Sequence, residues 1–87
     1  ETALLPLKQR IGKLLLEAES VHGCDRHGER YIEVPLSQGD IGEMLGVTRH
    51  SVQRELKTWI DSGILRKEKR HWVVADPKQL KVLLLED

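Results

Sequence analysis

The chain has 87 residues, 39% of them hydrophobic and 32% charged, which is enough for one small domain with a modest core. Its 14 Lys and Arg residues balance its 14 Asp and Glu residues, so the net charge alone argues against a nucleic-acid partner. A single cysteine excludes an internal disulfide, and no apolar stretch is long enough to span a bilayer.

The first predicted element is an N-terminal helix of about four turns. Pro6 is tolerated only near the start of such a helix. Its apolar positions recur at helical spacing: Leu4, Leu7, Ile11, Leu14, Leu15 and Ala18. Residues 22–30 are then expected to form a polar loop with two glycines, and residues 31–34 alternate like a short strand that ends at Pro35.

Residues 37–63 carry the pattern of two short helices joined by a tight turn. Ser37 and Asp40 resemble a capping box at the start of the first helix, and Gly46 is free to adopt the positive φ that ends it. Thr48 is a suitable cap for the second helix, and Gly42 lets the two helices approach closely. The residues expected on the buried faces are Ile41, Met44 and Leu45, then Val52, Leu56, Trp59 and Ile60. This arrangement is a helix-turn-helix.

Two short strand candidates follow at residues 64–67 and 70–74, around a charged turn at Glu68 and Lys69. They predict a β-hairpin, or wing, over residues 64–75. Asp76 and Pro77 then start a short closing helix that runs to Leu85. We therefore expect one α+β domain over residues 1–87, a winged helix-turn-helix with a three-helix core, a small antiparallel sheet, the wing and a short C-terminal helix.

The charges are distributed unevenly along the chain. Between Arg49 and Trp72 there are seven basic and three acidic residues, an excess of four positive charges, and the rest of the chain carries the opposite excess. The second helix presents Arg49, His50, Gln53, Arg54 and Lys57 on one face without an apolar residue. A local field of this kind attracts phosphates even when the net charge is zero.

This order of elements closely resembles the C-terminal DNA-binding domain of the Crp/Fnr regulators. The resemblance rests on Arg10-Ile11, on Asp40-Ile41-Gly42 and on the run Gly46-x-Thr48-Arg49-x-Ser51-Val52-x-Arg54-x-Leu56. It implies a bacterial, cytoplasmic transcription regulator that binds double-stranded DNA, with recognition helix 49–62 in the major groove. It also implies that the domain is not an enzyme.

Four side chains are candidates for base contacts. An arginine fork donates two hydrogen bonds to guanine, and the arginines that match Arg49 and Arg54 read bases in the catabolite activator. Many relatives have glutamate, an acceptor, where this chain has the donor His50, so the preferred base pair is expected to differ there, and either a guanine or a phosphate is open to His50. Gln53 suits adenine. For each of the four, a solvated helix face is the alternative.

The expected phosphate contacts lie at helix starts and in the wing: Ser37, Gln38, Thr48, Ser51, Lys57, Lys67, Lys69 and Arg70. Capping alone also explains Ser37 and Thr48, and a solvated hairpin also explains the wing lysines. Glu68 interrupts the basic run, and the wing turn lacks the glycine that many relatives have. Glu55 occupies a position that is usually aliphatic in helix-turn-helix proteins.

Rival chemistry has little support in the sequence. His22, Cys24 and His27 have a spacing that metal ligands can have, but no fourth ligand is evident and an exposed loop explains them, so no metal is expected. Cys24 lacks an evident base, and Trp59 and Trp72 suit the core better than base stacking. The alternative function is a winged helix that binds another protein, which would expose apolar anchors on the second helix.

The resemblance further implies that a ligand-sensing β-barrel and a dimerisation helix precede this domain in the full regulator and are absent from this chain. We therefore expect no cofactor in this domain, because any effector would bind the preceding part. The full protein is expected to be a homodimer, and the fragment a monomer or weak dimer. RNA polymerase is a candidate partner, and a membrane is not.

Overall fold

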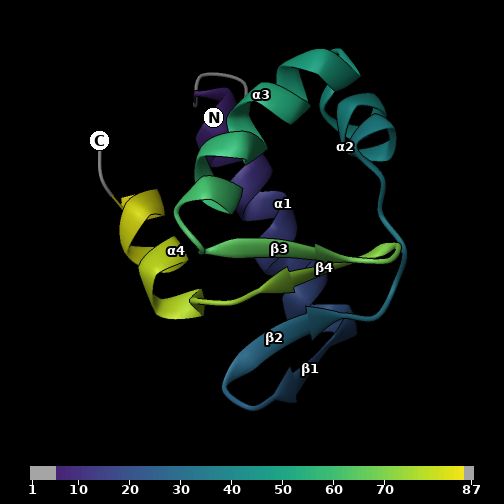
Figure 1. Cartoon of the computed structure of the whole chain (residues 1–87). Coiled ribbons are helices and arrows are strands. Elements are labelled where there is room, and N and C mark those ends of the chain that lie inside the picture. The colour runs from purple at the N-terminus through teal and green to yellow at the C-terminus, as the bar shows by residue number, and fades with distance from the viewer. Residues whose placement is uncertain (1–5, 86–87) are drawn as a thin grey trace.

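A computed structural model describes residues 6–85, which form helices on one side of a small antiparallel sheet (Figure 1). The helices are α1 (Leu7–His22), α2 (Gln38–Leu45), α3 (Arg49–Asp61) and α4 (Pro77–Leu85). The strands are β1 (Gly23–Arg26), β2 (Glu29–Ile32), β3 (Leu65–Glu68) and β4 (His71–Val74). The α+β winged helix-turn-helix predicted from the sequence is confirmed.

The strand order in the sheet is β1-β2-β4-β3, and every neighbouring pair is antiparallel. Alternation puts Ile32, Leu65, Trp72 and Val74 on one face, where they pack against helix residues such as Ile11 and Leu56. Cys24, Tyr31, Val73 and Arg66 form a cross-strand row on the other face. The core therefore fills the space between the helices and one side of the sheet.

Helix α1 forms as its apolar periodicity predicts, directly after Pro6. Ile11 and Leu15 are fully buried, and a Cβ at Gly12 would collide with the Leu84 side chain of α4. The glycine therefore permits close packing of α4 against α1. Leu4, the first position of the predicted stripe, lies outside the described residues.

The prediction of a polar loop over residues 22–30 is wrong, because most of that segment is the β1–β2 hairpin. His27 and Gly28 form its two-residue turn, both with positive φ, at 57° and 85°. The strand expected at residues 31–34 begins earlier, at Glu29, and ends at Ile32. The hairpin was missed because His-Gly is a weaker turn signal than Asn-Gly. The pairing of β2 with β4, which is distant in sequence, also stabilises this part of the sheet.

Two residues of the predicted buried faces are exposed, Met44 at 60% and Ile60 at 41%. They lie at the edges of their stripes, where Ile41 in α2 and Leu56 and Trp59 in α3 fill the core instead. Trp59 and Trp72 are 2% and 1% exposed, so both serve the core as expected.

Candidate nucleic-acid interface

The start of α2 is set by a reciprocal capping box. The Ser37 hydroxyl accepts a hydrogen bond from the Asp40 N–H at 3.0 Å, and the Asp40 carboxylate accepts one from the Ser37 N–H at 3.1 Å. The helix ends at Gly46, whose φ of 73° is left-handed. The predicted boundaries of the first helix of the motif are therefore confirmed by its caps.

Gly42 sits where α2 meets the turn before α3. A Cβ at this position would lie 2.7 Å from the Val47 carbonyl oxygen, closer than real Cβ atoms approach backbone. The Val47 N–H donates to the Gly42 carbonyl at 2.9 Å, which closes the turn. Thr48 then caps α3 by accepting from the Ser51 N–H at 3.1 Å. The turn places α3 across α2 at close range.

Helix α3 has one buried and one exposed side. Val52 and Leu56 are fully buried and face the core, whereas Arg49, His50, Gln53 and Arg54 are exposed. Within residues 6–85, none of these four side chains makes a hydrogen bond or ion pair, so their polar groups are free to meet a ligand. Lys57 on the same side is paired with Asp61 at 3.1 Å, and both are largely exposed.

Arg10 supports the interface from α1, although the sequence analysis assigned it no structural role. From α1, its guanidinium donates to the Leu45 carbonyl at the end of α2 at 2.7 Å. This bond satisfies a carbonyl that a helix end leaves without an intrahelical partner. It also fixes α2 relative to α1. The only sequence feature that pointed to this role was the Arg10-Ile11 pair at the start of α1, on which the family resemblance partly rests.

A hollow of about 390 Å³ separates the start of α2 from the wing. Ser37, Gln38, Gly39, Arg49 and Lys67 line it. The capping box uses the N–H of Asp40, which leaves the N–H groups of Gln38 and Gly39 without an intrahelical partner. Free N–H groups at a helix start beside two cationic side chains favour an anion.

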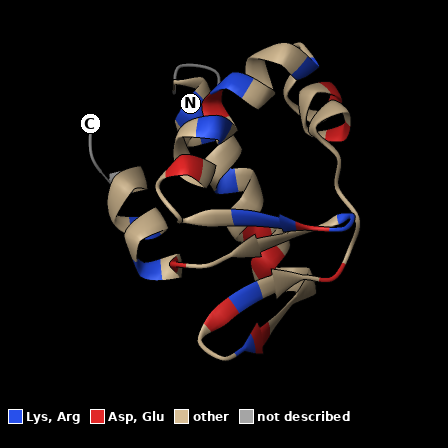
Figure 2. Ribbon diagram, viewed as in Figure 1, with Lys and Arg blue, Asp and Glu red and all other residues tan. Residues whose placement is uncertain are grey.

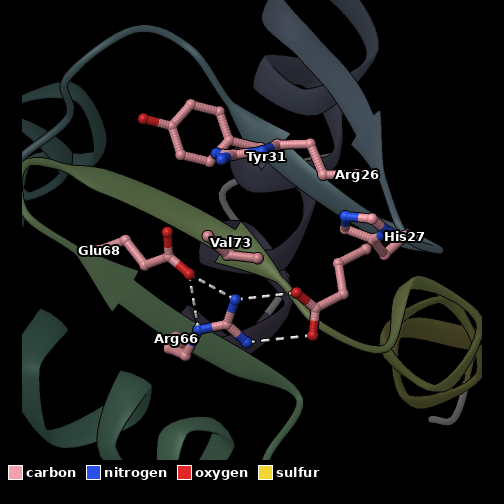
Figure 3. Close-up of a pocket in the computed structure, with 7 residues that line it drawn as sticks. Arg26, His27, Tyr31, Arg66, Glu68 and Val73 are labelled. Carbon is pink, nitrogen blue, oxygen red and sulfur yellow. Dashed lines mark hydrogen bonds and ion pairs between the residues drawn. The ribbon is translucent and has the colours of Figure 1, made fainter.

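The basic residues of the wing are exposed, but Arg66 is held in ion pairs. Figure 3 shows the Arg66 guanidinium between two carboxylates. It donates to Glu29 at 3.1 and 2.8 Å and to Glu68 at 3.1 and 2.6 Å. Hydrogen bonding by Arg66 lowers the pKa of Glu29 below its ordinary value, and the same bonds raise the pKa of Arg66. Arg66 therefore adds little to the positive excess counted from the sequence.

The surface charge remains uneven despite this neutralisation. In Figure 2, Lys and Arg outnumber Asp and Glu along α3 and at the tip of the β3–β4 hairpin, although both also carry acidic positions, whereas Asp and Glu mark α2 and the second half of α1. Lys69 and Arg70 form the wing turn and are exposed, with Lys69 at a φ of 57°. The wing tip therefore forms without the glycine that many relatives have. The basic surface is centred on α3 and the wing tip.

His22, Cys24 and His27 fall in three different places, at the end of α1, in β1 and in the hairpin turn. Among residues 6–85, no three His, Cys, Asp or Glu side chains are arranged to hold a metal ion. Over the same residues, no helix is both long enough and apolar enough to cross a membrane.

Comparison with known proteins gives a consistent family. Residues 9–83 match the Crp-like helix-turn-helix domain. CprK in complex with o-chlorophenolacetic acid is 34% identical, with a TM-score of 0.82 over 92% of this chain and 34% of that chain. The CO-dependent transcription factor CooA from Carboxydothermus hydrogenoformans, in its imidazole-bound form, is 27% identical, with a TM-score of 0.80 over 88% of this chain and 36% of that chain.

A third structure shares the fold at lower identity. TTHA1359, a transcriptional regulator of the CRP/FNR family from Thermus thermophilus, is 21% identical, with a TM-score of 0.80 over 97% of this chain and 43% of that chain. No curated protein matches the sequence. The chain thus spans less than half the length of each of these three structures.

Proposed function

This chain belongs to the Crp/Fnr family as the DNA-binding helix-turn-helix domain of a transcription regulator, and we propose that α3 reads base edges in the major groove through Arg49, His50, Gln53 and Arg54. The family is not enzymatic. The four side chains extend from one rigid helix that the core holds in place.

One observation carries this proposal: the exposed side of α3 is polar and its four candidate side chains have no partner within residues 6–85. An arginine that is already paired would have to break that pair before it met a base. Arg49 and Arg54 have no pair to break, so both guanidinium groups can donate to guanine O6 and N7.

We propose phosphate contacts around these base contacts. The hollow at the start of α2 suits one phosphate through Ser37, Gln38 and Lys67, and the cap of α3 suits another through Thr48 and Ser51. Lys69 and Arg70 at the wing tip and Lys57 on α3 suit the flanking backbone. For Lys57, the exposed pair with Asp61 costs little to break.

A protein-binding winged helix is the second candidate function. Met44 at 60% and Ile60 at 41% exposure are its only support on the helix-turn-helix within the described chain. They lie on different helices, and Ile60, in line with Gln53 and Lys57 near the end of α3, is the one exposed apolar side chain of that helix. The free arginines on α3 favour DNA over an apolar partner.

The whole regulator is proposed from the relatives. CprK and CooA are described with bound small molecules, and both chains are longer than this one. We propose that the effector of this regulator binds outside this domain. Two copies would then place two α3 helices on adjacent half-sites of bacterial DNA in the cytoplasm. RNA polymerase is the proposed partner once the regulator is bound to DNA.

The test is direct binding to duplex DNA. Sequences selected from a random duplex pool are measured with the wild type, Arg49→Ala and Lys78→Ala at low salt. Lys78 is exposed on α4, away from the interface, and its replacement removes the same charge. We expect Arg49→Ala to weaken binding by about 10- to 100-fold and Lys78→Ala by less than about twofold. Absence of wild-type binding, or equal losses in both variants, would refute the proposed function.

A further inference from the structure

Within the described residues, two hydrogen bonds from the wing meet at one carbonyl oxygen of the chain just before α2. The Trp72 indole Nε1 donates to the Leu36 carbonyl oxygen at 2.7 Å, and Lys67 Nζ donates to the same oxygen at 3.3 Å. Lys67 Nζ also lies 4.2 Å from the centre of the Trp72 ring. We call this three-residue arrangement the wing–linker contact.

The wing–linker contact is partly shielded from water. Trp72 is 1% exposed, and burial lowers the pKa of Lys67, which the charge of Asp40 opposes. A cation placed over an indole face is stabilised more strongly where water is excluded. The indole N–H of Trp72 therefore holds the Leu36 carbonyl in a setting where an unmade hydrogen bond is costly, and the exposed Lys67 ammonium adds a second, longer bond to the same oxygen.

The Leu36 carbonyl belongs to the peptide unit that leads directly into the α2 cap. Ser37 follows it, and the free N–H groups of Gln38 and Gly39 come next. Lys67 and these residues line the same hollow, to which α3 contributes Arg49. A shift of the Leu36 carbonyl would thus move the proposed phosphate-binding N–H groups relative to both the wing and α3.

The other tryptophan, Trp59, is buried in the core although its indole N–H makes no hydrogen bond. Trp59 is 2% exposed, and its Nε1 is buried without a hydrogen-bond partner. A buried tryptophan usually finds a partner for this N–H. Trp59 fills space in the core, whereas Trp72 fills space and also holds the Leu36 carbonyl.

We propose that Trp72 is a positioning residue for DNA backbone binding: its indole N–H, together with Lys67, holds the start of α2 against the wing so that both engage one phosphate. This inference rests on the proposed function. It assigns to a buried residue of the wing an effect on affinity that is independent of base sequence.

The test compares Trp72→Phe with Trp59→Phe, because both keep an aromatic ring in the core and both lose one indole N–H. Binding to one selected duplex is measured over a range of salt concentrations, with thermal unfolding followed in parallel. We expect Trp72→Phe to weaken binding by about 5- to 10-fold and to reduce the slope of log K against log salt by about one. Trp59→Phe should stay within about twofold, with an unchanged slope, because its N–H has no partner.

A purely structural role for Trp72 would not produce this pattern. It would lower the unfolding temperature while the folded variant kept the wild-type salt slope and affinity, and that result would overturn the proposal. In ¹⁵N NMR spectra, Trp72→Phe should also shift the amide signals of Gln38 and Gly39 more than Trp59→Phe does. Equal shifts in the two variants would contradict the proposal.

A second measurement covers the case in which Trp72→Phe does not fold. In the wild-type protein, the indole N–H of Trp72 should exchange with solvent at least about tenfold more slowly than an unprotected indole, because it is hydrogen-bonded and buried. Addition of the selected duplex should shift the signals of Gln38 and Gly39. Fast exchange, or no shift at these amides on a duplex that binds, would overturn the inference. Failure of the wild type to bind any duplex would instead overturn the proposed function.

Discussion

The exposed side of α3 and the β3–β4 wing are both rich in basic residues, but they hold them differently. On α3, Arg49 and Arg54 have no hydrogen bond or ion pair within residues 6–85. In the wing, Arg66 is paired with Glu29 and Glu68, and Lys67 lies over Trp72. The two regions look alike in composition, yet within residues 6–85 both arginines on the exposed side of α3 are unpaired, whereas in the wing Arg66 is paired and Arg70 at the tip is not.

This difference shows that counted charge and available charge are separate quantities. A guanidinium with two carboxylate partners contributes little field at a distance, since the opposite charges screen it locally. We infer a division of labour in which α3 reads sequence and the wing binds backbone.

The largest expected effect comes from comparing Arg54→Ala with Arg66→Ala, which remove the same charge from the two regions. On a selected duplex, Arg54→Ala should lose about 10- to 100-fold in affinity because a bidentate guanine contact is lost. Arg66→Ala should lose less than about twofold, because its partners already neutralise it. Fluorescence anisotropy at one fixed salt concentration measures both, and equal losses would abolish the distinction between the regions.

The next effect concerns the approach of α2 to the turn before α3. Gly42→Ala places a methyl group against the Val47 carbonyl and should destabilise the fold by about 1–3 kcal/mol. Gly39→Ala is the matched control in the same helix, since its Cβ would meet only Ser37 Oγ at 3.6 Å. The control should stabilise the protein slightly through better helix propensity. Urea unfolding measures both, and equal stabilities would show that the close approach is not required.

A smaller effect is expected at His50. His50→Glu replaces a donor by an acceptor on an exposed position of α3, so preference at one base pair should shift by about tenfold toward cytosine. Selection from a random duplex pool with each protein measures this preference. His50→Gln serves as a neutral control. If both variants select the same site as the wild type, His50 reads no base.

The smallest effect lies in the Arg66 pair and depends on pH. Arg66 lowers the pKa of Glu29 below its ordinary 4.5, so the pair favours folding above that value and loses this contribution as pH falls through the lowered pKa. Carboxyl ¹³C NMR should show Glu29 titrating below 4.5 in the wild type and nearer 4.5 in Arg66→Ala. An unchanged midpoint would show that Arg66 does not neutralise Glu29.

Local signals were sufficient for the helix-turn-helix. The Ser37 and Asp40 box, the left-handed Gly46, the Thr48 cap and the small Gly42 each act over a few residues, so their spacing predicts the geometry. The four base-contact candidates on α3 were also predictable, because residues three or four positions apart lie on the same side of a helix. Their base contacts stay predictions.

The β1–β2 hairpin and the pairing of charges across the sheet were not predictable in the same way. Glu29 and Arg66 are 37 positions apart and meet only because β2, β4 and β3 align side by side. Met44 and Ile60 have the spacing of buried residues, but Ile41, Leu56 and Trp59 occupy the core and leave them exposed. The Leu36 carbonyl likewise meets Trp72 only in the folded chain.

The order of the elements, the caps of the helix-turn-helix and the polar side of α3 can be predicted from the amino-acid sequence, because all of these depend on residues within a few positions of one another. Which cations are free follows from the fold, since pairing depends on which distant carboxylate, carbonyl or ring the fold brings within hydrogen-bonding distance. The same reason separates the two tryptophans: their immediate surroundings in sequence do not show that one N–H finds an acceptor and the other does not.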